Sequence, residues 1–87
     1  MNIESLTLNQ LRVGDCLTVA DVYGEDSMRR RLEDLGVVAG TQISCLMRSP
    51  MGDPCAYWIR GAVIALRDQD AQQIIGTRCP DRKERLL

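Results

Sequence analysis

The apolar residues of this 87-residue chain alternate with polar ones in two stretches that flank a segment of helical spacing. The run CLTVADV, residues 16–22, is rich in β-branched residues and follows a Gly-Asp turn, which predicts a first strand. In QISCLMR, residues 42–48, Ile43, Cys45 and Met47 alternate with more polar neighbours. This alternation predicts a half-buried strand with those three side chains facing inward.

Between these two strands the apolar period changes from two to about 3.6. Met28, Leu32 and Leu35 stand at i, i+4 and i+7, which places them on one helical face. An aspartate or serine at the start can act as the N-terminal cap. Gly36 follows directly and is typical of a helix end, so the pattern predicts a helix over 26–35.

Alternation resumes after residue 54 and predicts a compact series of strands. Residues 55–60 form a strand, and 63–67 form its hairpin partner across a Gly61-Ala62 pair, which suits a type II′ turn. A single helical turn is expected over 68–73, and a last short strand begins at Ile74 and fades near residue 77.

About five short strands, tight turns and one short helix after the first strand predict a mainly β fold. A sheet of this kind protects its edges by rolling up, which indicates a small, partly open β-barrel of SH3-like type. We expect one domain over residues 1–78. The charged segment 79–87 is expected to be a flexible C-terminal tail.

Length and charge exclude several functional classes. Eleven basic and twelve acidic residues give a net charge of -1, without the basic excess that phosphate binding needs, so no nucleic-acid partner is expected. The N-terminus resembles no secretory signal, and no stretch reaches the roughly 18 apolar residues of a membrane span. A cytoplasmic protein without direct membrane insertion is therefore the expectation.

The four cysteines do not form a recognisable metal site. Cys16, Cys45, Cys55 and Cys79 contain no C-x-x-C pair, and the chain has no histidine, so neither a metal nor any other cofactor is predicted. Reduced thiols are expected, with Cys45 buried in its strand and Cys79 reactive in the polar tail. Without an activated cysteine, a histidine or a paired carboxylate, no enzymatic activity is predicted.

The stretch SPMGDP, residues 49–54, separates two predicted strands. Pro50 and Pro54 fix their own φ angles, and Gly52 permits the chain to reverse between them. Two interpretations stay open: an ordinary hairpin connection, or a stiff docking loop with Met51 at its tip that loses little entropy on binding.

Three arginines, Arg29, Arg30 and Arg31, follow the start of the predicted helix. The helix dipole disfavours cations near this end by about 0.3–1 kcal/mol. Pairing of Arg29 with Glu33 and of Arg30 with Asp34 is the structural explanation, although each such pair contributes only about 0.2–0.5 kcal/mol. A partner with acidic or phosphate groups is the functional explanation.

Four motifs then resemble, in order, those of the ferrous iron transport protein A (FeoA) family: LTLNQLRVGD, RRRLEDLGVVAGTQI, SPMGDP and IRGAVIALRDQDAQQII. The resemblance covers about residues 6–76. Ala39 stands where the family usually has proline, Ser49 stands where alanine is common, and the cysteines lie outside the pattern. The matching positions are Arg31, Leu32, Leu35, Gly36, Gly40, Pro50, Gly52, Asp53, Pro54, Gly61, Leu66, Arg67, Ala71 and Ile74.

The resemblance implies a non-enzymatic accessory protein of ferrous iron uptake that contacts FeoB, the GTP-dependent membrane transporter. The alternatives are a regulatory module of an iron-dependent repressor system and a thiolate metal-binding protein. Self-association through an open barrel edge is left open. The residues expected to contact the partner are Arg29, Arg30, Arg31, Pro50, Met51, Gly52, Asp53 and Pro54.

Overall fold

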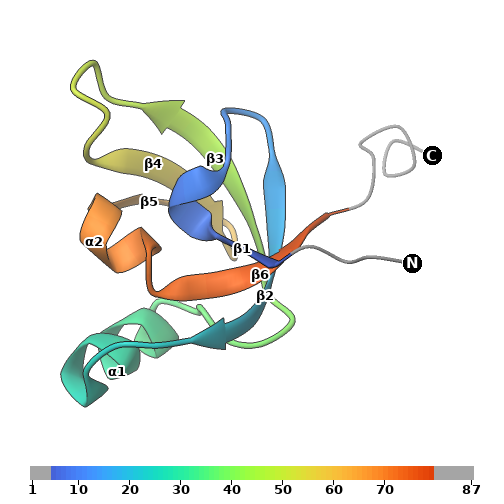
Figure 1. Cartoon of the computed structure of the whole chain (residues 1–87), viewed down its shortest axis with the longest axis vertical. Coiled ribbons are helices and arrows are strands. Elements are labelled where there is room, and N and C mark those ends of the chain that lie inside the picture. The colour runs from blue at the N-terminus through green and yellow to red at the C-terminus, as the bar shows by residue number, and fades with distance from the viewer. Residues whose placement is uncertain (1–4, 80–87) are drawn as a thin grey trace.

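The computed structural model describes residues 5–79, which form a small barrel of antiparallel strands with two short α-helices on its outside (Figure 1). One six-stranded sheet has the order β1-β6-β2-β3-β4-β5. No helix within residues 5–79 is long and apolar enough to cross a membrane. The elements are β1 (Ser5–Thr7), the 3-10 helix η1 (Leu8–Gln10), β2 (Cys16–Val22), α1 (Asp26–Asp34), β3 (Gln42–Arg48), β4 (Cys55–Ile59), β5 (Ala62–Leu66), α2 (Asp68–Ala71) and β6 (Ile74–Arg78).

The predicted mainly β, SH3-like fold is confirmed, and the strands predicted at 16–22 and 42–48 have the bounds of β2 and β3. The strand count differs, because β1 adds a sixth strand at the N-terminus. β1 is only three residues long and pairs with the sequence-distant β6, so no local alternation marks it. The helix α1 therefore follows the second strand and not the first.

The end of α1 confirms the stop predicted at Gly36. Gly36 has φ +100°, its N–H donates to Glu33 O at 2.9 Å, and the N–H of Val37 donates to Leu32 O at 2.9 Å. This is a Schellman motif, in which buried Leu32 and Val37 pack as its apolar pair. Leu35, predicted on the same helical face as Leu32, is 37% exposed, because it is the C-cap residue beyond the last helical turn. The N-cap is Glu25, one residue before the predicted cap.

The β4–β5 hairpin turns at Arg60 and Gly61, and not at Gly61-Ala62 as the sequence suggested. Ile59 pairs with Ala62, and both turn residues have positive φ, 48° and 84°. Positive φ at both central positions defines a type I′ turn, so the predicted type II′ turn is wrong. The pattern missed this because arginine rarely adopts positive φ.

A bulge in β3 overturns the predicted inward position of Met47. Cys45 pairs with Tyr57, but the register shifts before Met47 pairs with Ala56. The extra residue, Leu46, reverses the alternation, so Met47 is 62% exposed. The inward positions of Ile43 and Cys45, which precede the bulge, are confirmed.

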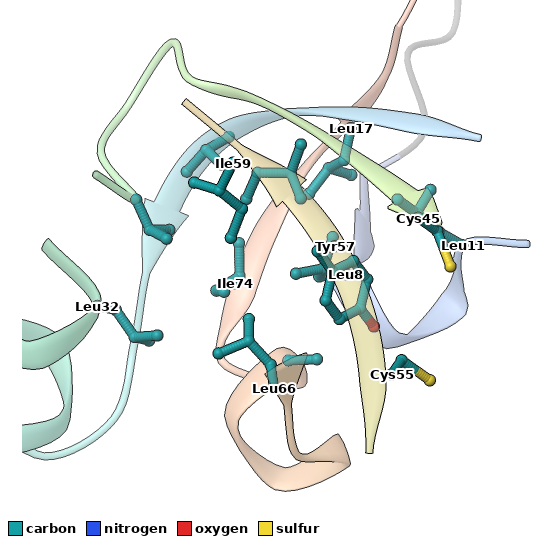
Figure 2. Packing of buried hydrophobic residues seen from close by; sticks show 14 of the residues in the cluster. Leu8, Leu11, Leu17, Leu32, Cys45, Cys55, Tyr57, Ile59, Leu66 and Ile74 are labelled. Carbon is teal, nitrogen blue, oxygen red and sulfur yellow. The ribbon is translucent and has the colours of Figure 1, made fainter. Parts of the chain in front are cut away.

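The core fills the barrel between β2, β3, β4 and β6, with contributions from η1, α1 and α2 (Figure 2). Tyr57 is the largest fully buried side chain, and Figure 2 shows its ring beside Leu8 in the centre of the cluster. Burial raises the pKa of the Tyr57 hydroxyl and also raises the pKa of the Cys45 thiol, because it disfavours the charged form of each group.

β2 and β6 approach each other closely at Gly76. A Cβ atom at this position would lie 2.0 Å from the carbonyl oxygen of Thr18. The register of β2 against β6 also shifts between Val19 and Asp21, beside this contact. Only glycine fits here without a displacement of one strand.

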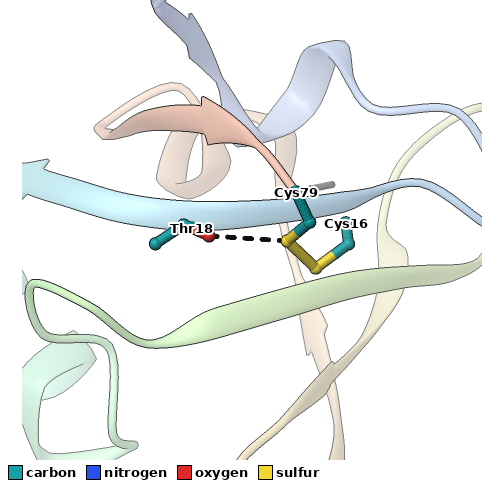
Figure 3. The surroundings of a disulfide bond; sticks show 3 residues. All are labelled: Cys16, Thr18 and Cys79. Carbon is teal, nitrogen blue, oxygen red and sulfur yellow. Dashed lines mark hydrogen bonds between the residues drawn. A yellow bond between two sulfur atoms is a disulfide. The ribbon is translucent and has the colours of Figure 1, made fainter. Parts of the chain in front are cut away.

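The same strand pair joins Cys16 to Cys79 in a disulfide, which corrects the expectation of reduced thiols at these two positions and of a reactive Cys79 (Figure 3). Cys45 and Cys55 are free thiols, as expected. Leu17 pairs with Arg78, so the next positions along the ladder, Cys16 and Cys79, lie opposite each other with 5.1 Å between their Cα atoms. The N–H of Cys79 donates to Cys16 O at 2.8 Å. The ladder thus continues two residues past the predicted strand end; the rest of the predicted tail, 80–87, lies outside the described residues.

Candidate functional site

The loop between β3 and β4 begins with a tight turn that exposes its tip. The N–H of Gly52 donates to Ser49 O at 2.8 Å, with Pro50 and Met51 at the two corners, as the residue preferences of a type I turn favour. Met51 is 88% exposed, the highest value among the large apolar side chains of residues 5–79. The loop therefore holds an apolar side chain in solvent on a short, proline-fixed turn.

Asp53 fastens the other half of this loop to α2. Its Oδ1 accepts a hydrogen bond from the backbone N–H of Asp68 at 2.9 Å, a donor in the first turn of α2 that has no partner inside the helix. On the loop side, the thiol of Cys55 donates to Gly52 O at 3.4 Å. The loop and α2 are thus held as one surface.

Arg48, the last residue of β3, connects the base of this loop to η1. One guanidinium nitrogen, Nη2, donates to the carbonyl oxygens of Asn9 and Leu11, the first at 2.9 Å. The other, Nη1, donates to the sulfur of Cys55 at 3.5 Å. The side chain satisfies carbonyl groups at the end of η1 that no strand reaches.

The three arginines of α1 differ in their surroundings. Arg29 pairs with Asp26 at 2.6 Å on the exposed surface, one turn toward the N-terminus and not with Glu33 as proposed from the sequence. Arg30 forms no ion pair with any residue from 5 to 79. Arg31 crosses to α2, where its Nη2 lies 3.2 Å from Oδ2 of Asp70.

The Arg31–Asp70 pair is asymmetric in its exposure. The side chain of Asp70 is 6% exposed and that of Arg31 is 65% exposed. A buried carboxylate needs a partner, whereas an exposed guanidinium does not, so this contact serves Asp70 and fixes α2 against α1.

Two adjoining hollows follow α2 from α1 to the loop. The hollow on the α1 side has a volume of about 490 Å³, and the one on the loop side has a volume of about 670 Å³. Arg67 and Gln69 line both, so we call their union the α2 groove. Its lining residues are Glu25, Ser27, Met28, Arg31, Asp53, Pro54, Arg67, Asp68, Gln69 and Asp70.

The α2 groove brings together residues that the sequence placed in two separate motifs. Arg31 lies at one end, and Asp53 and Pro54 lie at the other. Figure 1 shows the same arrangement, with α2 between α1 and the β3–β4 loop. Arg29, Arg30, Pro50, Met51 and Gly52 do not line the groove.

The sequence analysis did not place Arg67 among the contact residues, although both hollows include it. It lies between β5 and α2 as the N-cap residue, a position that local pattern assigns to helix capping. The groove lining carries four carboxylates, from Glu25, Asp53, Asp68 and Asp70, against the guanidinium groups of Arg31 and Arg67. Its net charge is therefore negative, which favours a basic group of a partner.

Within residues 5–79, no three histidine, cysteine, aspartate or glutamate side chains gather closely enough to hold a metal ion. Cys16 and Cys79 are joined to each other, and Cys45 and Cys55 are buried.

Comparison with known proteins identifies related sequences. A family model described as the FeoA domain matches residues 6–78. A curated relative from Porphyromonas gingivalis, an Fe(2+) transport protein A/Fe(2+) transporter FeoB fusion protein, is 32% identical over 69 residues. The match covers 79% of this chain but only 8% of that relative's length.

Solved structures show the same fold. The FeoA protein of Chlorobium tepidum is 34% identical with a TM-score of 0.79, covering 87% of this chain and 73% of that one. Stenotrophomonas maltophilia FeoA, described as a prokaryotic SH3 domain protein and solved with zinc, is 27% identical with a TM-score of 0.70, covering 79% of this chain and 86% of that one. A manganese-dependent transcriptional repressor reaches a TM-score of 0.79 at 22% identity, covering 91% of this chain and 44% of that one, which shows a shared fold alone.

Proposed function

The chain belongs to the FeoA family, and from this membership we propose that it is a cytoplasmic accessory protein of ferrous iron uptake that acts by contact with a FeoB-type transporter. One observation carries the proposal: in the Porphyromonas gingivalis relative, an FeoA segment and FeoB are parts of a single polypeptide. Two proteins that occur fused in one organism often function in contact as separate chains in another. The mechanism we propose is binding, without enzymatic activity, nucleic acid or a cofactor.

The β3–β4 loop and the α2 groove are the proposed contact surface. Met51 is an apolar side chain on a turn that is already ordered, so its insertion into a partner pocket costs little entropy. Asp53 joins this turn to the groove through Asp68, so both parts meet a partner at once. Pro50, Gly52 and Pro54 act by shaping the loop.

The charges predict what the partner offers. A basic side chain of the transporter fits the net negative α2 groove, where Arg67 and Arg31 limit the position that it can take. Arg30, which has no ion-pair partner among the described residues, suits an acidic or phosphate-bearing group beyond the groove, with Arg29 beside it.

Titration of the purified protein against the detergent-solubilised FeoB-type transporter tests the proposal. Saturable binding is expected, and Met51→Ala should weaken it by about tenfold or more, as apolar anchors often do. Val38→Ala is the matched control, because Val38 is exposed but follows the C-terminal end of α1, outside the groove. No binding by the unmodified protein would exclude direct contact.

The repressor-like fold supports a second candidate, a regulatory module of a metal-dependent repressor system. Such a module would bind a repressor chain instead of the transporter. Parallel titration against both partners distinguishes the two functions, since only one is expected to show binding that depends on Met51.

A further inference from the structure

β5 has one free edge. It closes the sheet order next to β4 and has no strand neighbour on its other side among the described residues. Natural edge strands usually carry lysine, proline or a bulge that discourages pairing with another chain. The sequence of β5, AVIAL, has none of these.

The register identifies which backbone groups point to this edge. The two-residue turn is closed by the Ile59–Ala62 pair, whose backbone groups bond to each other. Hydrogen-bonded and non-bonded pairs alternate from there, so Ile64 and Leu66 also face β4. Val63 and Ala65 direct their N–H and C=O groups to the free edge.

The side chains around this edge are apolar and exposed. Val63 is 63% exposed, and its cross-strand neighbour Trp58 is 45% exposed. Leu46 and Met47 extend the apolar surface onto β3 with exposures of 41% and 62%. An edge strand bordered by such a surface is a pairing site for another chain.

We propose that the free edge of β5 pairs with β5 of a second copy of this chain, antiparallel and centred on Ile64. In this register Val63 lies opposite Ala65 of the second copy, and each such pair exchanges two backbone hydrogen bonds. Because of the two-fold symmetry, Ala65 also lies opposite Val63 of the second copy. In each copy, the two N–H and two C=O groups of Val63 and Ala65 therefore all have partners. The two sheets become one continuous sheet.

The symmetry of the edge favours a second copy over another strand, because the uncharged sequence AVIAL places its two outward-facing residues, Val63 and Ala65, on either side of Ile64. Trp58 and Val63 of one copy then form an apolar row with Ala65 of the second copy across the dimer interface. No like charges lie opposite each other along the pairing.

The predicted dimer is weak. A five-residue strand buries less than the roughly 1,200–2,000 Å² of a standard stable interface, so we expect a dissociation constant of about 10 µM to 1 mM. Assembly would therefore depend on local concentration, and a high local concentration at a membrane-bound partner would promote it.

Residue-resolved amide hydrogen exchange tests the pairing in the purified protein. Between about 20 µM and about 1 mM protein, exchange of the Val63 and Ala65 amides should slow by about twofold to sixfold over the expected range of dissociation constants, because the monomer fraction falls by this factor. The amides of Ala62, Ile64 and Leu66, already bonded to β4, should not change. Exchange at Val63 and Ala65 that is independent of concentration would overturn the proposal.

Ala65→Pro removes an outward N–H without removing a bond to β4, so it should raise the dissociation constant in sedimentation equilibrium by about tenfold or more. Val63→Lys provides a second variant if the proline prevents folding, and Val38→Lys is its control away from the edge. Dimerisation that survives Val63→Lys as well as Val38→Lys would place the contact elsewhere and refute the pairing.

Discussion

The backbone N–H of Asp68 donates a hydrogen bond to the side chain of Asp53, so the β3–β4 loop caps the N-terminus of α2. The two residues of the loop expected to matter most therefore have separable roles. The side chain of Met51 is 88% exposed, whereas that of Asp53 bonds to α2 and stabilises the fold.

Met51→Ala is expected to leave the free energy of unfolding within about 0.5 kcal/mol of the unmodified protein, because the side chain is 88% exposed. Asp53→Ala should lower it by about 0.5–2 kcal/mol through the loss of the cap. Urea denaturation of both single variants checks this. A large loss of stability in Met51→Ala would show that the methionine packs against the fold.

Gly76→Ala should destabilise the protein by about 1–3 kcal/mol or more, because its new methyl group meets the Thr18 carbonyl. Gly40→Ala is the comparison, since Gly40 has φ +92° but no atom within 4 Å of a new Cβ. Its cost is conformational only, about 1–2 kcal/mol. Thermal unfolding of both variants separates steric overlap from backbone conformation.

Reduction of the Cys16–Cys79 disulfide should lower the free energy of unfolding by about 2–4 kcal/mol. The bond closes a loop of sequence separation 63 and so lowers the conformational entropy of the unfolded chain. The Cys16→Ser/Cys79→Ser variant should match the reduced protein. Peptide mapping after alkylation without reductant checks the pairing itself. Rapid alkylation of Cys79 in the untreated protein would contradict it.

Alkaline pH should destabilise the fold through Tyr57. The ordinary pKa of tyrosine is 10.0, and burial raises the pKa of Tyr57 in the folded state, so the unfolded chain loses the proton first. The contribution of this pKa difference to the free energy of unfolding is fully present below about pH 10. Above that pH it decreases by up to about 1.4 kcal/mol per pH unit. Cys45, whose ordinary pKa of 9.0 is also raised by burial, adds a loss that starts lower.

Tyr57→Phe isolates this contribution. Its free energy of unfolding should fall less steeply than that of the unmodified protein between pH 10 and 11. Equal slopes for the two proteins would mean that the Tyr57 hydroxyl reaches solvent in the folded state.

Replacement of Arg31 should destabilise the protein more than replacement of Arg30, because Arg31→Ala leaves the Asp70 carboxylate buried without its partner. We expect a cost of about 1–3 kcal/mol for Arg31→Ala and less than about 0.5 kcal/mol for Arg30→Ala. Chemical denaturation near pH 7 checks both. Equal effects would show that water reaches Asp70.

The alternation of apolar and polar residues, together with the turn and cap residues, predicted the elements that neighbouring residues determine. β2 and β3 have the predicted bounds, and α1 ends at the predicted glycine. The misassigned features depend on pairing between distant segments. β1 exists through β6, and Met47 is turned outward by a bulge against β4. The Cys16–Cys79 bond likewise follows from a ladder register that sequence spacing does not contain.

The candidate site divides in the same way. The SPMGDP turn could be predicted as an exposed, proline-fixed loop because its residues determine their own geometry. The α2 groove could not, since it forms only where α1, the loop and α2 meet. Arg67 was recognised only as part of a family motif, and its place in both hollows follows from the tertiary structure.

The contacts of Arg48 connect the base of the proposed docking loop directly to η1, near the N-terminus. Its guanidinium binds the carbonyl groups of Asn9 and Leu11, while the next residue along the chain begins the loop. The loop that carries Met51 is therefore connected to η1 through the side chain of Arg48 and to α2 through the side chain of Asp53. Since η1 and α2 are themselves joined by a hydrogen bond from Asn9 Nδ2 to Asp68 Oδ1 at 3.1 Å, a partner that binds the loop would act on one connected surface of the barrel.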